Sequence, residues 1–67
     1  MKAYMVMVTM ETSMRDTYRD EYNGVAYADK GLAEIVKADA ERELADNSNF
    51  WGADVEEIDV PDCIVFV

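Results

Sequence analysis

The chain has 67 residues, of which 15 are acidic and 6 basic, so its formal net charge is −9. This charge argues against direct binding to nucleic acid phosphates and to anionic membranes, because both need a basic patch. A domain of this length buries only about 60% of its unfolded surface, so we expect one small domain, residues 1–67, without an elaborate active site.

Residues 2–10 (KAYMVMVTM) predict the first strand, and apolar side chains alternate onto both of its faces. Tyr4, Val6 and Val8 share one face, and Ala3, Met5 and Met7 share the other. This pattern is typical of a central strand covered on both sides. A single helix covers only one face, so we expect the Met5 and Met7 face to meet solvent, a second copy or a partner.

Residues 11–15 are polar and predict a loop or hairpin turn before a second strand over residues 16–27. In this strand Tyr18 and Tyr22 share a face with Asp20. Asn23-Gly24 interrupts the strand and is also typical of a type I′ turn, which would give a hairpin with strands 17–22 and 25–28. We favour one continuous strand with a bulge at Gly24, because residues 25–27 then lead directly into the helix.

Residues 29–47 (DKGLAEIVKADAERELADN) predict the helix against which everything else packs. Its expected apolar stripe consists of Leu32, Ala33, Val36, Ala40 and Leu44. Asp29 is the expected N-cap, and the polar residues from position 47 onward supply the stop.

The C-terminal third predicts a loop followed by one or two strands. In the loop, residues 47–52, we expect Phe50 or Trp51 to close the end of the core. Residues 54–60 predict the third strand, with Ile58 and Val60 inward and Glu57 and Asp59 outward. Residues 63–67 predict a short fourth strand. The fold class is therefore α+β, a single helix on a mainly antiparallel sheet of three to four strands in the order β-β-α-β(-β).

The residue types needed for common catalytic sites are missing from the sequence. Without histidine there is no Ser-His or Cys-His arrangement, and no glycine-rich loop precedes a Lys-Ser or Lys-Thr pair. Residues 46–57 have the length of a calcium-binding loop, but Trp51 takes the position that requires glycine. We therefore expect no enzyme activity, no cofactor and no bound metal.

Cys63 is the one cysteine and lies in an apolar run, so we expect a buried thiol and a reducing environment. The sequence has no apolar run of 18 residues and no recognisable signal peptide. These features indicate a cytoplasmic protein.

Acidic residues of the helix and the third strand are the candidates for a partner contact. Asp39, Glu43 and Asp46 lie along one edge of the helical stripe, beside Ile35. The full candidate set is Asp39, Glu43, Asp46, Glu56, Glu57, Asp59, Tyr18, Tyr22 and Trp51. Two interpretations stay open: a solvated surface relieved by neighbouring lysines and arginines, or an acidic face that mimics nucleic acid and is anchored by the aromatic residues.

The segment VAYADKGLAEIVKADAERELADNSNFWGADVEEIDV resembles a pattern of small acidic α+β proteins of phages and mobile elements. The shared features are a strand ending in Ala-Asp, an Ala- and Glu-rich helix, a polar turn and an acidic strand. Such proteins include anti-CRISPR proteins and other inhibitors of host defence. The resemblance implies a non-catalytic protein that binds a nuclease or surveillance complex in the host cytoplasm, and it assigns no role to any single residue.

Two hypotheses follow. The first is a non-enzymatic inhibitor or regulator that binds a basic protein partner, such as a nucleic-acid-binding host-defence complex, and makes no direct contact with nucleic acid or membrane. The alternative is a small structural or regulatory homodimer without catalytic activity, joined through the Met-rich first strand or the C-terminal strand.

Overall fold

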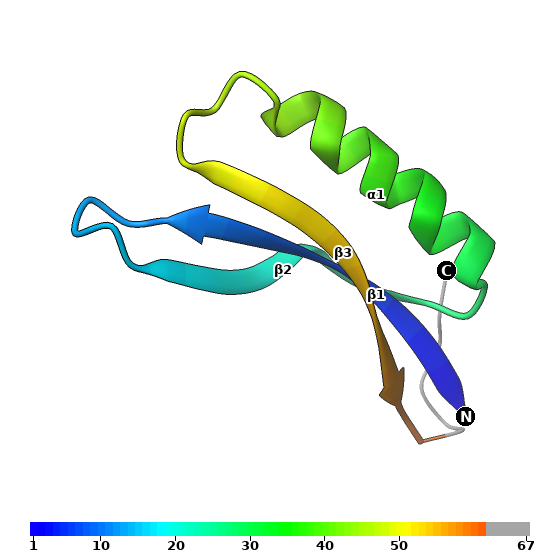
Figure 1. Cartoon of the computed structure of the whole chain (residues 1–67). Coiled ribbons are helices and arrows are strands. Elements are labelled where there is room, and N and C mark those ends of the chain that lie inside the picture. The colour runs from blue at the N-terminus through cyan, green and yellow to red at the C-terminus, as the bar shows by residue number, and fades with distance from the viewer. Residues whose placement is uncertain (62–67) are drawn as a thin grey trace.

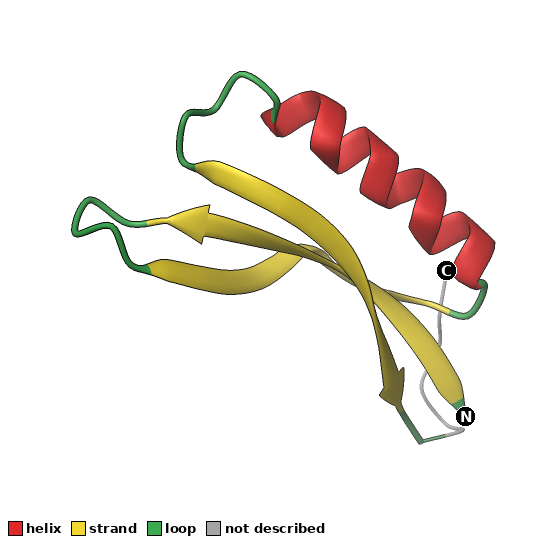
Figure 2. Ribbon diagram, viewed as in Figure 1, coloured by secondary structure: helices red, strands yellow, loops and turns green. Residues whose placement is uncertain are grey.

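An antiparallel sheet of three strands carries one helix on one face in the computed structural model, which describes residues 1–61. The elements are β1 (Lys2–Glu11), β2 (Thr17–Tyr27), α1 (Lys30–Leu44) and β3 (Phe50–Asp59). Figure 1 shows α1 running along the twisted sheet, and Figure 2 distinguishes the helix from the strands by colour. The predicted α+β fold with this element order is confirmed. The predicted fourth strand, residues 63–67, and Cys63 lie outside the described residues.

β1 is the central strand of the sheet, as its apolar character on both faces predicts. The strand order is β2-β1-β3, and both neighbours pair with β1 in antiparallel fashion. Val6 and Val8 are buried on the face that meets α1. Met5 and Met7 are half-buried on the opposite face.

β2 is one continuous strand with a bulge, as favoured over the two-strand hairpin. Met5 pairs with Ala26 and Met7 with Glu21, so the single residue Val6 stands opposite a longer stretch of β2, residues 22–25. Gly24 has φ +69° within this stretch, a conformation that L side chains rarely adopt. The bulge therefore depends on glycine at this position and bends the second half of β2 under the helix.

α1 begins and ends with local hydrogen bonds. The Asp29 carboxylate accepts a hydrogen bond from the Gly31 N–H at 2.8 Å, which confirms the predicted N-cap. The helix stops at Leu44, three residues before the predicted end at position 47. The Asn47 N–H donates to the Leu44 carbonyl oxygen at 3.0 Å, so a turn forms where another helical turn was expected.

Leu32 does not belong to the buried stripe of α1, contrary to the prediction. It is 39% exposed, whereas Ala33 and Ala40 are fully buried and Val36 and Leu44 are partly buried against the core. Residues four apart advance by about 40° around a helix, so Leu32 and Leu44 are separated by about 120°. Both cannot face the same sheet, and Ala33 occupies the sheet-facing position at the start of the helix.

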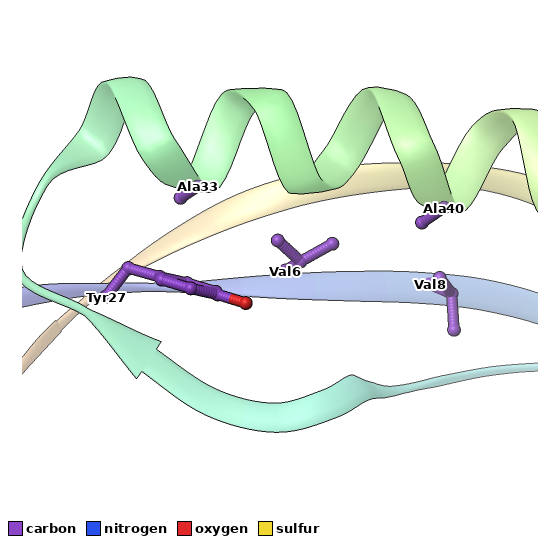
Figure 3. Close-up of a cluster of buried hydrophobic side chains, with 5 residues drawn as sticks. All are labelled: Val6, Val8, Tyr27, Ala33 and Ala40. Atoms are coloured by element: carbon purple, nitrogen blue, oxygen red, sulfur yellow. The ribbon is translucent and has the colours of Figure 1, made fainter. Parts of the chain in front are cut away.

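The core lies between α1 and the middle of β1 (Figure 3). Ala33 and Ala40 point from the helix toward the sheet, Val6 points up from β1, Val8 lies farther along β1, and Tyr27 lies at the end of β2. Phe50, Ala53 and Val55 of β3 pack around this cluster and are partly buried. The prediction that an aromatic residue at position 50 or 51 closes the core is confirmed for Phe50.

β3 differs from the prediction in its start and in the direction of its side chains. It begins at Phe50, so part of the predicted loop is strand. Val55 pairs with the core residue Val6, and Glu57 pairs with Tyr4, which places Glu57 on the helix side of the sheet. Ile58 pairs with Ala3 on the opposite face. The register with β1 fixes this alternation, and the sequence of β3 alone did not reveal it.

Substituting Val6 tests the position of the core. We expect Val6→Ala to lower the free energy of unfolding by about 2 kcal/mol, because it leaves a cavity beneath the helix at a side chain only 1% exposed. Ile35→Ala is the control, since Ile35 is 63% exposed and a surface substitution changes stability by less than about 0.5 kcal/mol. Urea denaturation measures both, and equal losses would contradict the described packing.

Candidate functional site

A groove opens between the C-terminal end of α1 and the first half of β2. Its volume is about 260 Å³. The lining residues are Val8, Met10, Tyr18, Asp20, Glu21, Tyr22 and Leu44. We refer to the apolar lining residues Val8, Met10 and Leu44 as the floor of the groove and to Tyr18 and Tyr22 as its tyrosine wall. Asp20 and Glu21 are the acidic residues of the lining.

The groove exists because α1 lies mainly over β1 and β3, leaving the first half of β2 uncovered. Tyr18 pairs with Met10 and Asp20 with Val8, so all four residues share the helix side of the sheet. Leu44 is the last residue of the helix and is half-buried above them. Beyond Leu44 the chain turns toward β3, and no described element covers Tyr18 and Asp20, both of which are exposed.

Tyr22 joins β2 to the helix at the edge of the groove. Its hydroxyl donates a hydrogen bond to the Glu43 carboxylate. This bond raises the pKa of the Tyr22 phenol above its ordinary value, and the negative charges of Glu43 and Asp39 act in the same direction. Asp39 and Glu43, one helical turn apart, therefore both lie near Tyr22.

The structure brings some of the predicted contact residues together and separates others. Tyr18 and Tyr22 line the groove, and Glu43 and Asp39 lie next to it, near Tyr22. Asp46 is exposed in the turn after α1, and Trp51 is 64% exposed on β3. Glu56, Glu57 and Asp59 occupy other parts of the sheet, so the predicted residues do not form one continuous acidic face.

Glu56 belongs to an ion-pair network on the sheet face opposite the helix. Arg19 of β2 reaches across β1 to two carboxylates of β3. Its Nη1 lies 2.8 Å from Glu56 Oε1, its Nε lies 3.2 Å from Asp54 Oδ1, and its Nη2 also pairs with Asp54. These carboxylates raise the pKa of Arg19 further, so the guanidinium stays charged. The network ties the two outer strands to each other.

Glu57 and Asp59 lie at the other end of the sheet, near the start of β1. Lys2 Nζ is 2.9 Å from Asp59 Oδ1 and 4.0 Å from Glu57 Oε2. The hydrogen bond between Lys2 and Asp59 raises the pKa of the lysine and lowers the pKa of the carboxyl group. The Tyr4 hydroxyl adds a contact of 3.4 Å to Glu57. Lys2 therefore offsets part of the negative charge of these two acidic residues, mainly that of Asp59.

Unlike the carboxylates of β3, the carboxylates nearest the groove form no ion pair with a lysine or arginine of the described chain. Among residues 1–61, no lysine or arginine lies within ion-pair distance of Asp20, Glu21 or Glu43. Asp39 pairs with Arg42 on the helix surface. Glu21 is a lining residue as well, but it pairs with Met7, so its side chain leaves the strand on the other face of the sheet. Asp20 and Glu43 are thus the uncompensated carboxylates on the groove side.

Asp20 and the apolar floor of the groove were not predicted as site residues. The alternation of β2 already places Asp20 with Tyr18 and Tyr22, which is a signal present in the sequence. No pattern in the sequence indicates that Val8, Met10 and Leu44 would line the groove. Their place in the lining depends on where the helix crosses the sheet.

Neither a metal cluster nor a membrane-spanning helix occurs in the part of the chain that the structure describes. Within residues 1–61, no three side chains of the metal-binding types gather closely enough to hold an ion. The single helix of this region is too short and too polar to cross a bilayer. No protein-family model matches the chain, and neither a curated protein nor a solved structure is significantly similar to it.

The hydrogen bond between Tyr22 and Glu43 has a measurable consequence for pH. We expect Glu43→Ala to move the pKa of Tyr22 down toward its ordinary value of 10.0, whereas Glu34→Ala leaves it unchanged. Glu34 is nine residues from Glu43 and points to the opposite side of the helix. NMR titration of labelled tyrosine rings measures the shift, and an unchanged Tyr22 pKa in Glu43→Ala would contradict the contact.

The raised pKa of Tyr22 also determines how the stability of the fold changes with pH. Because the pKa of Tyr22 is raised in the folded chain, the hydrogen bond stabilises the fold fully below the ordinary tyrosine pKa of 10.0. This contribution is lost as the pH rises through the higher pKa of the folded state. Wild type and Glu43→Ala should therefore converge in stability at strongly alkaline pH.

Arg19 supplies a second prediction. Arg19→Ala should lower the free energy of unfolding by about 1 kcal/mol, since it breaks a bidentate network that joins both outer strands. Lys30→Ala removes the same charge from an exposed position that has no ion-pair partner among the described residues, so it controls for the general repulsion of an acidic chain. Urea denaturation at low and high salt distinguishes the two. A similar loss in both variants would show that the network itself contributes nothing.

Proposed function

We propose that this chain is a non-enzymatic binding protein that inhibits or regulates a basic protein partner, one that normally binds nucleic acid. The observation that carries the proposal is the pair of uncompensated carboxylates, Asp20 and Glu43, beside a groove lined by Tyr18 and Tyr22. The net charge of −9 and the absence of histidine agree with it.

The proposed mechanism is competition for basic side chains. Carboxylates held on a folded surface occupy the lysines and arginines that the partner otherwise uses to bind phosphates. Opposite charges accelerate the encounter, and added salt weakens it because exposed charges are screened. Tyrosines at the contact supply apolar area that charge alone lacks.

The biological setting that we propose comes from the resemblance to small acidic phage proteins. A host-defence nuclease or surveillance complex fits the partner chemistry, since such a complex holds nucleic acid with a basic surface. The site of action is then the cytoplasm of the host cell.

The alternative is a homodimer joined through the Met-rich first strand or the C-terminal strand, and the route through the Met5 and Met7 face has less support. Arg19, Asp54 and Glu56 form their network on that face, next to Met7. A second copy packed there would remove these charges from water, which is costly unless each finds a partner. The open groove on the other face is a more favourable place for a basic partner.

A capture experiment tests the proposed function. The immobilised chain is mixed with a lysate of the native host, washed at low and high salt, and eluted with short duplex DNA. We expect a basic nucleic-acid-binding protein to be retained at low salt and released by both high salt and DNA. Retention that neither treatment reverses would overturn the proposal.

Charge reversal localises the contact. The double variant Asp39→Lys and Glu43→Lys should weaken binding of the captured protein at least about tenfold, because it places like charges at the interface. Glu34→Lys makes a reversal on the opposite side of the helix and should cost much less. Equal weakening by both variants would indicate diffuse attraction instead of a defined site.

A further inference from the structure

The groove combines an apolar floor with nearby negative charge, and this combination limits the kind of group that can bind there. Met10, Val8 and Leu44 offer apolar surface, and Asp20 lines the groove beside them. Glu43 lies next to the groove, where it accepts the hydrogen bond of Tyr22. Neither carboxylate has a basic partner in the described chain. An anion would be repelled. A purely apolar group would leave these carboxylates unpaired as water is excluded, which costs free energy.

The size of the groove also restricts what can bind in it. Its volume of about 260 Å³ lies below the range of roughly 300–1,000 Å³ that is typical of small-molecule and cofactor sites. One long side chain of a partner is a more suitable occupant than a separate organic molecule. That side chain needs an apolar stem and a positively charged head.

Two side chains meet this description, and the tyrosine wall favours arginine over lysine. A guanidinium group is planar, stacks on aromatic rings and is more weakly hydrated than an ammonium group. It also forms paired hydrogen bonds with a carboxylate. The Tyr18 side chain has no hydrogen bond in the described chain and the residue is 49% exposed, so its ring is open to stacking.

We propose that the groove binds one arginine side chain of the basic partner. Its methylene groups lie on Met10 and Leu44, and its guanidinium group stacks on Tyr18 and pairs with Asp20 and Glu43. This inference rests on the proposed function and specifies the contact by which the partner is recognised. The hydrogen bond from Tyr22 to Glu43 holds that carboxylate at the groove edge before binding.

Short capped peptides test the inference directly. One peptide carries a single arginine between glycines, a second carries citrulline, which has the same shape without the charge, and a third carries lysine. Binding to the isotope-labelled chain is followed by NMR. We expect the arginine peptide to shift the signals of Tyr18 and Leu44, the lysine peptide to bind about threefold more weakly, and the citrulline peptide to cause no saturable shift.

Paired variants separate the groove from the general acidity of the surface. The double variant Asp20→Asn and Glu43→Gln should weaken arginine binding about tenfold, whereas Glu34→Gln should leave it nearly unchanged. Tyr18→Leu should weaken it about threefold, and Tyr18→Phe, which keeps the ring, should not. Dispersion of the amide signals shows that each variant is folded.

The outcomes distinguish the inference from the proposed function. Equal shifts with arginine and citrulline, shifts centred on Glu57 and Asp59, or no saturable shift would each overturn the arginine groove. The proposed function is judged separately, by salt- and DNA-sensitive capture of a basic protein. If that protein binds the Asp20→Asn and Glu43→Gln variant as tightly as wild type, the function stands and the groove is not its contact.

Discussion

The close approach of α1 to β1 is the constraint on which the rest of the structure depends. Ala33 and Ala40 are fully buried at this contact, and their small side chains let the helix lie close above Val6 and Val8. The helix is thereby centred over β1 and β3. The first half of β2 is left without cover, and the groove beside Tyr18 is a direct consequence of that placement.

The distribution of the basic residues determines where negative charge remains. Lys2 and Arg19 compensate carboxylates of β3, and Lys37 and Arg42 pair with acidic residues on the helix surface. The groove side of β2 receives none of these cations. Asp20 and Glu43 therefore keep their negative charge beside the groove, although other exposed carboxylates such as Glu34 also have no ion pair among the described residues.

The bulge in β2 connects the core to the candidate site. Gly24, at φ +69°, allows residues 22–25 to stand opposite Val6, so that Tyr27 enters the core while Tyr22 reaches the helix. Tyr22 then donates its hydrogen bond to Glu43. The same bulge thus lets β2 contribute Tyr27 to the core and Tyr22 to the groove edge, where it contacts Glu43.

The sequence by itself determined the element order, the central position of β1, the continuous β2 with its bulge and the N-cap at Asp29. These features are local, since strand alternation, glycine chemistry and capping act over a few residues. Only the tertiary structure decided that Leu32 faces solvent, that Ile58 lies opposite the helix side and that Arg19 compensates Glu56. Strand register and helix placement join residues far apart in the chain, and side-chain patterns within one element do not encode those distances.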